Sequence, residues 1–273
     1  MNPCAGPWKP TSPIMPVKAF TPGVTSSASS AAPSPLLANL VSQWKMNAAS
    51  GQVEPDTING HDLANNGTVG SAAGKVNNCR VFPGSGSWLS HATGATFNLY
   101  PYTITCWLKV SSGSSYWLWR YNKALNGYAG YFTAGKISFF HYVTGSNKID
   151  GTFATAINDD TWKHIALVVN ASGCKLYING VSDGTLPWTG TPQAPSSGGY
   201  FGASVSNLDN VGFAGSMDVM KVWDRALPEE EVLLDYNGGA GIDNLKLAAG
   251  TTLNLEALTG NQTVKSIEQI EMI

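Results

Sequence analysis

Short stretches of strand-forming residues recur along residues 37–236, and clusters of turn-forming residues separate them. The stretches are rich in Val, Ile, Thr and aromatic residues, as β-strands are. Gly, Asn, Ser and Pro lie between them, and Asn179-Gly180 in particular predicts a tight hairpin turn. This pattern predicts an all-β fold and excludes a helical bundle or a coiled coil. The predicted strands cover 41–46, 79–82, 102–110, 116–121, 136–143, 162–169, 174–178 and 217–223.

One helix is predicted, at the end of this region. Pro228 suits the first helical position, and the glutamates at 229–231 suit the positive end of the helix dipole. Gly238 or Gly239 ends the helix. Many short strands followed by one short helix are typical of a β-sandwich.

Charged residues are scarce in this chain. It has 16 Lys and Arg, 18 Asp and Glu, and a formal net charge of −2, so that charged residues make up 12% of 273. An ordinary soluble domain has about 25%. Because nucleic acid and anionic membranes require a clustered basic excess, we expect neither as a partner. The apolar run at 165–169 is too short to span a membrane, and the first eight residues lack the pattern of a secretory signal.

The four cysteines are too scattered for a disulfide framework or a zinc site. They are Cys4, Cys79, Cys106 and Cys174. Cys79 and Cys106 lie in strand-like stretches, which predicts that they are small buried hydrophobic residues. A disulfide bond between these two cysteines is an alternative if their strands are neighbours.

Composition divides the chain into three parts. Residues 1–36 are rich in Pro and Ser and contain no acidic residue, which predicts an extended arm ordered by a partner or, alternatively, a disordered linker. Residues 37–239 form the predicted sandwich. Residues 240–273 contain no aromatic residue, and their alternating leucines predict a small hairpin that packs on the sandwich or on another chain.

Six stretches resemble, in order, the strand motifs of laminin-G-like domains in the concanavalin A-like lectin and glucanase group. The resemblance implies a jelly-roll β-sandwich, to which 1–36 adds an extended arm and 240–273 a short C-terminal β extension. The fold is used by binding modules, adhesion proteins, some glycosidases and viral surface proteins, so function depends on the site. The stretches are LVSQWKMN at 40–47, FPG at 82–84 with Trp88-Leu89, YTITCWLK at 102–109, DTWKHIALV at 160–168, KLYING at 175–180 and FAGSMDVMKVWDRAL at 213–227.

The carboxylates argue against an enzyme. Glycosidases of this fold need a pair of carboxylates, one as acid and one as base or nucleophile. The chain has no glutamate between Glu54 and Glu229, and most aspartates in this interval lie beside turn-forming residues. It has no G-x-S-x-G and no H-E-x-x-H motif. We therefore expect a protein without catalytic activity.

The aromatic residues give the candidate ligand site. Strict alternation in the stretch YWLWRY places Trp117 and Trp119 on one face of a strand, where they either belong to the core or form a stacking platform for sugars. Tyr131 follows shortly after this stretch, and His141 would face the same ligand. Trp188 is expected to be exposed in a loop. These five residues are the candidate ligand-binding residues.

A calcium ion is implied by the resemblance. Many domains of this fold hold Ca²⁺ between loops through carboxylate and carbonyl oxygens. Asp218 stands at an acidic position of the family, whereas Val219 replaces the acidic residue that follows it. Asp56, near the start of the domain, is the candidate second ligand. The alternative is that Asp218 makes structural hydrogen bonds at the start of a strand.

We expect a non-catalytic structural or binding protein, and two settings stay open. In the first, it lies on the surface of a virion as a bacteriophage capsid decoration, fibre or tail-associated protein. Residues 1–36 would bind other capsid proteins, residues 240–273 would form a homo-oligomer, and the sandwich would bind cell-surface glycans. In the second, it is a carbohydrate-binding adhesin or lectin module of a secreted bacterial protein, at the cell surface or outside the cell.

Overall fold

A computed structural model describes most of the predicted sandwich. The predicted arm before residue 34 and the predicted tail after residue 238 lie outside the described residues, so their roles stay predictions. The described residues are 34–84, 86–92, 97, 99–110, 116–121, 126–144, 147–188, 190, 192–195, 198–202 and 212–238.

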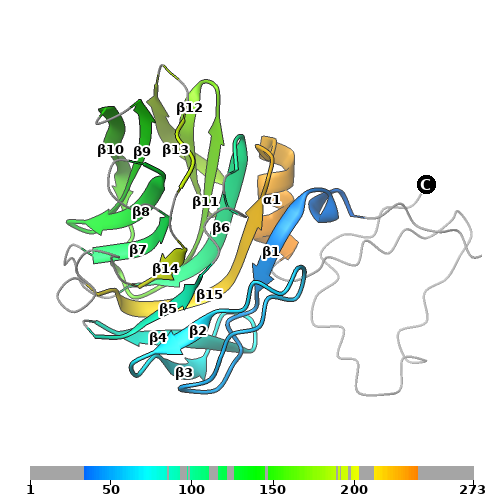
Figure 1. Ribbon diagram of the computed structural model, residues 1–273, viewed down its shortest axis with the longest axis vertical. Coiled ribbons are helices and arrows are strands. Elements are labelled where there is room, and N and C mark those ends of the chain that lie inside the picture. The colour runs from blue at the N-terminus through cyan, green and yellow to red at the C-terminus, as the bar shows by residue number, and fades with distance from the viewer. Residues whose placement is uncertain are drawn as a thin grey trace, which may run out of the picture. The chain divides into compact units, whose positions relative to one another are not determined.

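Two antiparallel β-sheets pack face to face and form a sandwich (Figure 1). The first sheet has the strand order β13-β12-β11-β6-β15-β4-β3, and β1 pairs with the second half of β15. Its strands are β1 (Leu40–Trp44), β3 (Gly70–Ala73), β4 (Asn78–Pro83), β6 (Tyr102–Lys109), β11 (Trp162–Asn170), β12 (Gly173–Ile178), β13 (Val181–Pro187) and β15 (Ala214–Trp223).

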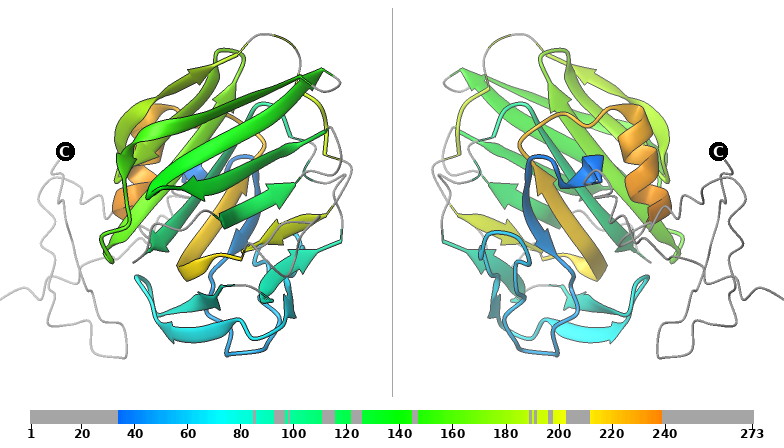
Figure 2. Two further views of the ribbon diagram at one scale, coloured as in Figure 1. Left: turned by 90° about the vertical axis from the view of Figure 1, so that its left-hand side faces the viewer. Right: turned by 90° about the vertical axis from the view of Figure 1, so that its right-hand side faces the viewer.

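The second sheet has the strand order β10-β9-β8-β7-β14-β5-β2. Its outer side is turned toward the viewer in the left panel of Figure 2. Its strands are β2 (Ala64–Asn66), β5 (Trp88–His91), β7 (Tyr116–Tyr121), β8 (Tyr128–Thr133), β9 (Lys136–Thr144), β10 (Asn147–Ala156) and β14 (Gly199–Phe201).

The outer face of the first sheet is covered where α1 (Glu229–Gly238) lies against it (Figures 1 and 2). Strand β6 is therefore buried along nearly its whole length, on the core side and on the helix side. Under the helix, Asp235 accepts hydrogen bonds from Lys221 and His164. The apolar residues of this layer are Ala166, Val168, Tyr177, Trp223, Leu227 and Val232.

Residues 34–36, which composition assigned to the arm, contact the sandwich. The short 3₁₀ helix η1 (Pro35–Leu37) begins there. The indole of Trp223 donates a hydrogen bond to the carbonyl of Leu36 at 2.8 Å, and the guanidinium of Arg225 donates to the carbonyls of Pro35 and Ala38. Residues 34–36 thus belong to the folded unit.

Two local predictions are confirmed by the structure. Asn179 and Gly180 join β12 to β13, and both have positive φ, as a two-residue hairpin of this type requires. Helix α1 begins at Glu229, one residue after the first helical position that the sequence predicted, and ends at Gly238, one of the two predicted ends.

The cysteines among the described residues are free and buried, as predicted for Cys79 and Cys106. Strand β15 separates the strands of Cys79 and Cys106, so the condition for a bridge between them is not met.

Candidate ligand-binding face

A β-bulge separates the two tryptophans that alternation placed on one face. The pairing of β7 with β8 shifts between Trp117 and Trp119, and Leu118 is the extra residue. Leu118 and Trp119 are both fully buried in the core, whereas Trp117 is half-buried on the outer face. The prediction that both indoles share a face is wrong, because a bulge reverses the alternation beyond it.

His141 and Trp188 also belong to the core. The ring of His141 is 1% exposed and stacks on Tyr128 with 5.3 Å between ring centroids. Burial lowers the pKa of His141 to about 4, so the ring is neutral at neutral pH. Trp188 is 7% exposed and packs edge-on against His141, so the expectation of an exposed loop tryptophan is wrong. The reason is that the large apolar ring of a tryptophan is stabilised by burial, and this loop passes close enough to the core for the ring to pack there.

The outer face of β7, β8 and β9 brings together four aromatic side chains, which we call the aromatic face. Trp117 lies 5.4 Å from Tyr131 and 5.9 Å from Phe140, measured between ring centroids. Phe140 in turn contacts Tyr142 at 5.7 Å. Phe140 is 4% exposed and forms the base of the cluster, while the other three rings are half-buried around it.

Polar groups border the aromatic face. The guanidinium of Arg120 lies 4.5 Å from the centroid of the Trp117 ring, a cation–π distance. The hydroxyl of Tyr131 donates to Asp150 on β10 at 2.5 Å. Burial and this hydrogen bond raise the pKa of Tyr131, which keeps its hydroxyl protonated. The face therefore combines apolar rings with a guanidinium over the Trp117 ring and a carboxylate at the Tyr131 hydroxyl. Apolar rings with a few polar groups beside them are typical of ligand sites.

Sequence reasoning found two members of this face and missed the others. Trp117 and Tyr131 were candidates, and the structure brings them together. Phe140 and Tyr142 alternate with Phe139 and His141 along β9, so the period was readable from the sequence. The sequence did not tell which of the two alternating sets faces the core.

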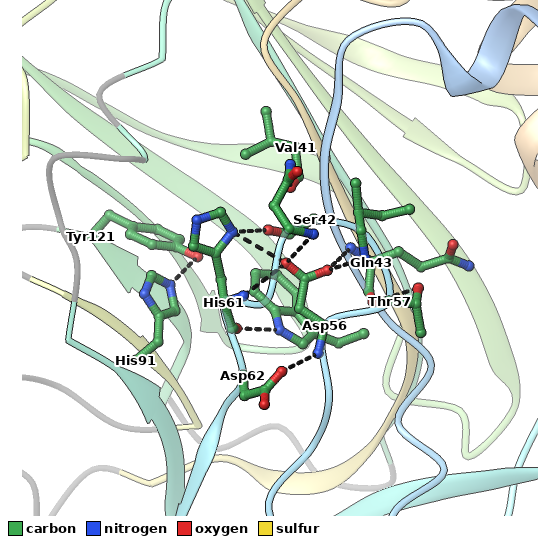
Figure 3. A network of polar contacts seen from close by, with 12 residues as sticks. Val41, Ser42, Gln43, Asp56, Thr57, His61, Asp62, His91 and Tyr121 are labelled. Carbon is green, nitrogen blue, oxygen red and sulfur yellow. Dashed lines mark hydrogen bonds and ion pairs between the residues drawn. The ribbon is translucent and has the colours of Figure 1, made fainter.

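Asp56, the proposed calcium ligand, is the centre of a hydrogen-bond network (Figure 3). Its carboxylate accepts hydrogen bonds from the backbone N–H groups of Gln43, Ile58 and His61 at 2.9–3.1 Å. These bonds hold the pKa of Asp56 below its ordinary value although burial opposes them. Since N–H groups occupy the directions that a metal ion would need, this carboxylate does not fit Ca²⁺.

The same network contains a serine, a histidine and an aspartate, but not in the geometry of a catalytic triad. Ser42 Oγ lies 2.8 Å from Nδ1 of His61, and Asp56 Oδ2 lies 3.1 Å from that same nitrogen (Figure 3). A triad requires the hydroxyl and the carboxylate on opposite ring nitrogens. The arrangement therefore orients a loop and does not activate Ser42 as a nucleophile.

Asp218 also binds backbone amides. Its carboxylate accepts from the N–H of Val76 and of Val219, both at 2.8 Å, and it is fully buried. Val219 has a φ of 38°, rare for a β-branched residue, at the bulge of β15. Asp218 thus stabilises a strained bulge. Within the described ranges, no three His, Cys, Asp or Glu side chains gather as a metal site would require.

A family model for the concanavalin A-like lectin/glucanases superfamily matches residues 83–233. No curated protein sequence matches the chain. None of the helices in the described ranges has the length and apolar character of a membrane span.

Several solved structures have the same fold. The binding domain of Paraclostridial mosquitocidal protein 1 is 20% identical with a TM-score of 0.62, and the match covers 76% of this chain and 54% of that one. The receptor-binding domain of the botulinum neurotoxin C/D mosaic serotype is 15% identical with a TM-score of 0.59, covering 73% and 51%. This chain thus spans about half the length of these toxin domains.

A third similar structure is matched almost over its full length. Domain 4 of AbnA, a GH43 extracellular arabinanase from Geobacillus stearothermophilus, was solved in complex with arabinotriose. It is 18% identical with a TM-score of 0.56, and the match covers 71% of this chain and 97% of that domain. At such identities, the similarity shows the jelly-roll fold.

Proposed function

Since this chain belongs to the concanavalin A-like lectin/glucanase superfamily, we propose that it is a non-catalytic carbohydrate-binding domain whose ligand stacks on the aromatic face. The observation that carries this proposal is the contact of Trp117 with Tyr131, two half-buried rings on adjacent strands of the second sheet. A pyranose ring has an apolar C–H face that packs on an aromatic ring, and hydroxyl groups at its edge. The guanidinium of Arg120 over the Trp117 ring and the carboxylate of Asp150 at the Tyr131 hydroxyl supply hydrogen-bonding groups for such hydroxyls.

The two outer faces of the sandwich differ in a way that favours this site. Helix α1 and the apolar layer beneath it cover the central part of the outer face of the first sheet. The aromatic face lies on the outer side of the second sheet, where Trp117, Tyr131 and Tyr142 keep part of their surface exposed. Partly exposed aromatic clusters are a common mark of binding surfaces.

The similar structures support a glycan as the ligand. The AbnA domain was solved with arabinotriose bound, and one botulinum neurotoxin binding domain was solved in complex with SialylT. For botulinum neurotoxin type C, cell entry depends on interaction with two ganglioside molecules. These ligands are sugars or sugar-bearing lipids.

A binding role without catalysis is favoured by the carboxylates of the second sheet. Its seven strands contain one acidic residue, Asp150, whose carboxylate accepts a hydrogen bond from the Tyr131 hydroxyl. Glycosidic hydrolysis needs two carboxyl groups on either side of the bond. The superfamily includes glucanases, so turnover of any bound oligosaccharide is the measurement that would contradict this part of the proposal.

A glycan array followed by calorimetric titration of a bound oligosaccharide tests the site. Trp117→Ala and Tyr131→Ala should each weaken binding about tenfold or more, because a ring that stacks on a ligand buries enough apolar area for about 1.5 kcal/mol. Leu233→Ala is the matched control, since Leu233 is 45% exposed on α1, at the other sheet. Unchanged affinity in both aromatic variants would remove the aromatic face as the site.

The setting of the domain is a further part of the proposal. We place it on a virion surface, as a bacteriophage decoration, fibre or tail-associated protein, with a secreted bacterial adhesin as the alternative. The support is compositional: a Pro- and Ser-rich segment precedes the folded unit, and such segments bind in the grooves of partners. Deleting residues 1–33 should abolish incorporation into particles and leave the melting temperature unchanged. Normal incorporation after this deletion would contradict the anchoring role.

A further inference from the structure

Arg80 on β4 is a buried cation enclosed by the loop that follows β1. Its exposed fraction is 0%. Its Nη1 donates to the carbonyl oxygens of Ala48 and Ala49 at 2.8 and 2.6 Å, and its Nη2 donates to the carbonyl of Gln52 at 3.1 Å. Three carbonyl oxygens from one short segment thus converge on a single positive charge.

Glu54 adds a carboxylate to the same loop. It is 1% exposed, and its two oxygens accept hydrogen bonds from the N–H groups of Asn47 and Ala48 at 3.1 and 3.0 Å. Burial raises the pKa of Glu54, and the Arg80 charge opposes that rise. Burial likewise lowers the pKa of Arg80, and Glu54 opposes that change. The two charges therefore compensate each other inside the fold.

Backbone carbonyl oxygens that converge on one positive charge are ligands that proteins also use for Ca²⁺. A guanidinium can take the same place. It stays charged at every physiological pH, and its N–H groups point outward in a plane, so it can bind several carbonyls at once. In this chain the three converging carbonyl oxygens already bind a cation, the guanidinium of Arg80 on β4.

We propose that the Arg80 guanidinium substitutes for a structural divalent cation, and that this domain keeps residues 47–54 folded without Ca²⁺. The inference stands apart from the glycan proposal, since Arg80 belongs to the first sheet. It is consistent with the contacts of the two carboxylates that the family resemblance suggested as calcium ligands. Asp56 and Asp218 are both engaged by backbone N–H groups.

Thermal melting of the full chain tests the proposal. The wild type should melt at the same temperature in excess EDTA and in millimolar CaCl₂. Arg80→Met keeps an unbranched apolar stem but removes the guanidinium, so the three carbonyls lose their donor and Glu54 loses a nearby positive charge. The variant should lower the melting temperature by about 10 °C or more. Arg80→Lys should lose less, because a single ammonium keeps the charge but not the planar set of donors. Lys45→Met, at an exposed position, should melt like the wild type.

Two results would overturn the proposal. A wild type that melts several degrees lower in EDTA and recovers in CaCl₂ requires a bound metal ion. An Arg80→Met variant that melts with the wild type shows that the guanidinium does not hold the loop. If Arg80→Met does not fold, the melting of the wild type in EDTA and in CaCl₂ and the melting of Arg80→Lys still test the proposal. Melting does not report on ligand binding at the aromatic face. The Arg80 proposal can therefore be contradicted while glycan binding is observed, and glycan binding can be absent while the Arg80 proposal holds.

Discussion

The indole of Trp119 on β7 lies over the backbone of Gly130 on β8, in the space that a side chain at position 130 would occupy. The two residues are directly paired, and a Cβ added to Gly130 would lie 2.4 Å from Cε2 of the indole. Real Cβ atoms do not come this close, so the ring or the strand would have to move. The absence of a side chain at Gly130 thus allows Trp119 to be fully buried.

Gly130→Ala should therefore destabilise the domain by about 1–3 kcal/mol, the usual range for overpacking a core. Chemical denaturation measures the change in the free energy of unfolding. Gly70→Ala on β3 is the matched control, because its Cβ would meet Val81 at an ordinary 3.6 Å. Its effect should stay within about 0.5 kcal/mol. Equal stability of the two variants would mean that the indole has room to move aside.

Truncation of the two tryptophans of β7 should cost very different amounts of unfolding free energy. Trp119→Ala removes a fully buried ring and should cost about 3–5 kcal/mol of unfolding free energy. Trp117→Ala removes a half-buried ring from the outer face and should cost no more than about 1 kcal/mol. Denaturation curves of the two variants measure the difference. Similar losses in both would contradict the bulge and return the strand to strict alternation.

The sequence predicted the strands that carry a strong apolar signal. The predicted 116–121 coincides with β7, and 102–110, 136–143 and 162–169 differ from β6, β9 and β11 by one residue at an end. The strands β8, β10 and β14 were not predicted. Strand β10 reads NKIDGTFATA, a polar edge strand with little apolar alternation, so its pairing with β9 comes from tertiary context.

The site was predictable only in part, for a physical reason. Alternation tells which residues share a face, but one extra residue in a strand exchanges the two faces beyond it. The bulge at Leu118 sends Trp119 inward and leaves Trp117 outside. On β9 the period was clear, yet His141 and Tyr142 are both aromatic and polar, so their residue types did not identify the core side. Only the packing of the whole sheet decides this.

Two buried histidines should make the domain sensitive to acid. Burial lowers the pKa of His91 and of His141 to about 4, whereas an unfolded chain has an ordinary histidine pKa near 6.5. Between these values the unfolded chain binds protons that the folded chain does not, so stability falls as the pH drops from about 6.5 toward 4. Each histidine accounts for a loss of stability on the order of 3 kcal/mol over this pH interval. His141→Phe should retain the ring stacking and flatten this part of the pH profile of the melting temperature. An unchanged profile would mean that His141 is accessible to protons in the folded state.

Asp218 should affect the pH dependence of stability in the direction opposite to that of the buried histidines. Burial raises its pKa to about 6 from an ordinary value of 3.8, so the folded chain holds this proton more tightly than the unfolded chain. Its contribution is therefore fully present below about pH 4 and is lost as the pH rises through about 6. Asp218→Asn removes this opposing effect, so the variant should lose more stability than the wild type between neutral and acidic pH. Melting curves across that range measure both slopes, and a smaller acid loss in the variant would contradict the assignment.

Asp235 on α1 is the counter-charge of a buried cluster beneath the helix. Its carboxylate accepts from Lys221 at 2.5 Å and from His164 at 3.1 Å, and it is 2% exposed. Burial opposes ionisation, but the Lys221 charge and the His164 contact hold the pKa of Asp235 below its ordinary value. Asp235→Asn would leave a buried ammonium without a counter-charge, which should cost about 3–5 kcal/mol of unfolding free energy.

Replacing both partners, as Lys221→Met with Asp235→Leu, should cost less than Asp235→Asn alone, because no unpaired charge remains under the helix. The exposed pair of Lys109 and Asp160, 3.7 Å apart, provides the control. Asp160→Asn should change stability by no more than about 0.5 kcal/mol, since solvent screens an exposed ion pair. Urea denaturation of the three variants gives the ranking. A loss in Asp235→Asn as small as that in Asp160→Asn would show that water reaches Lys221, and that apolar contacts alone hold α1 on the first sheet.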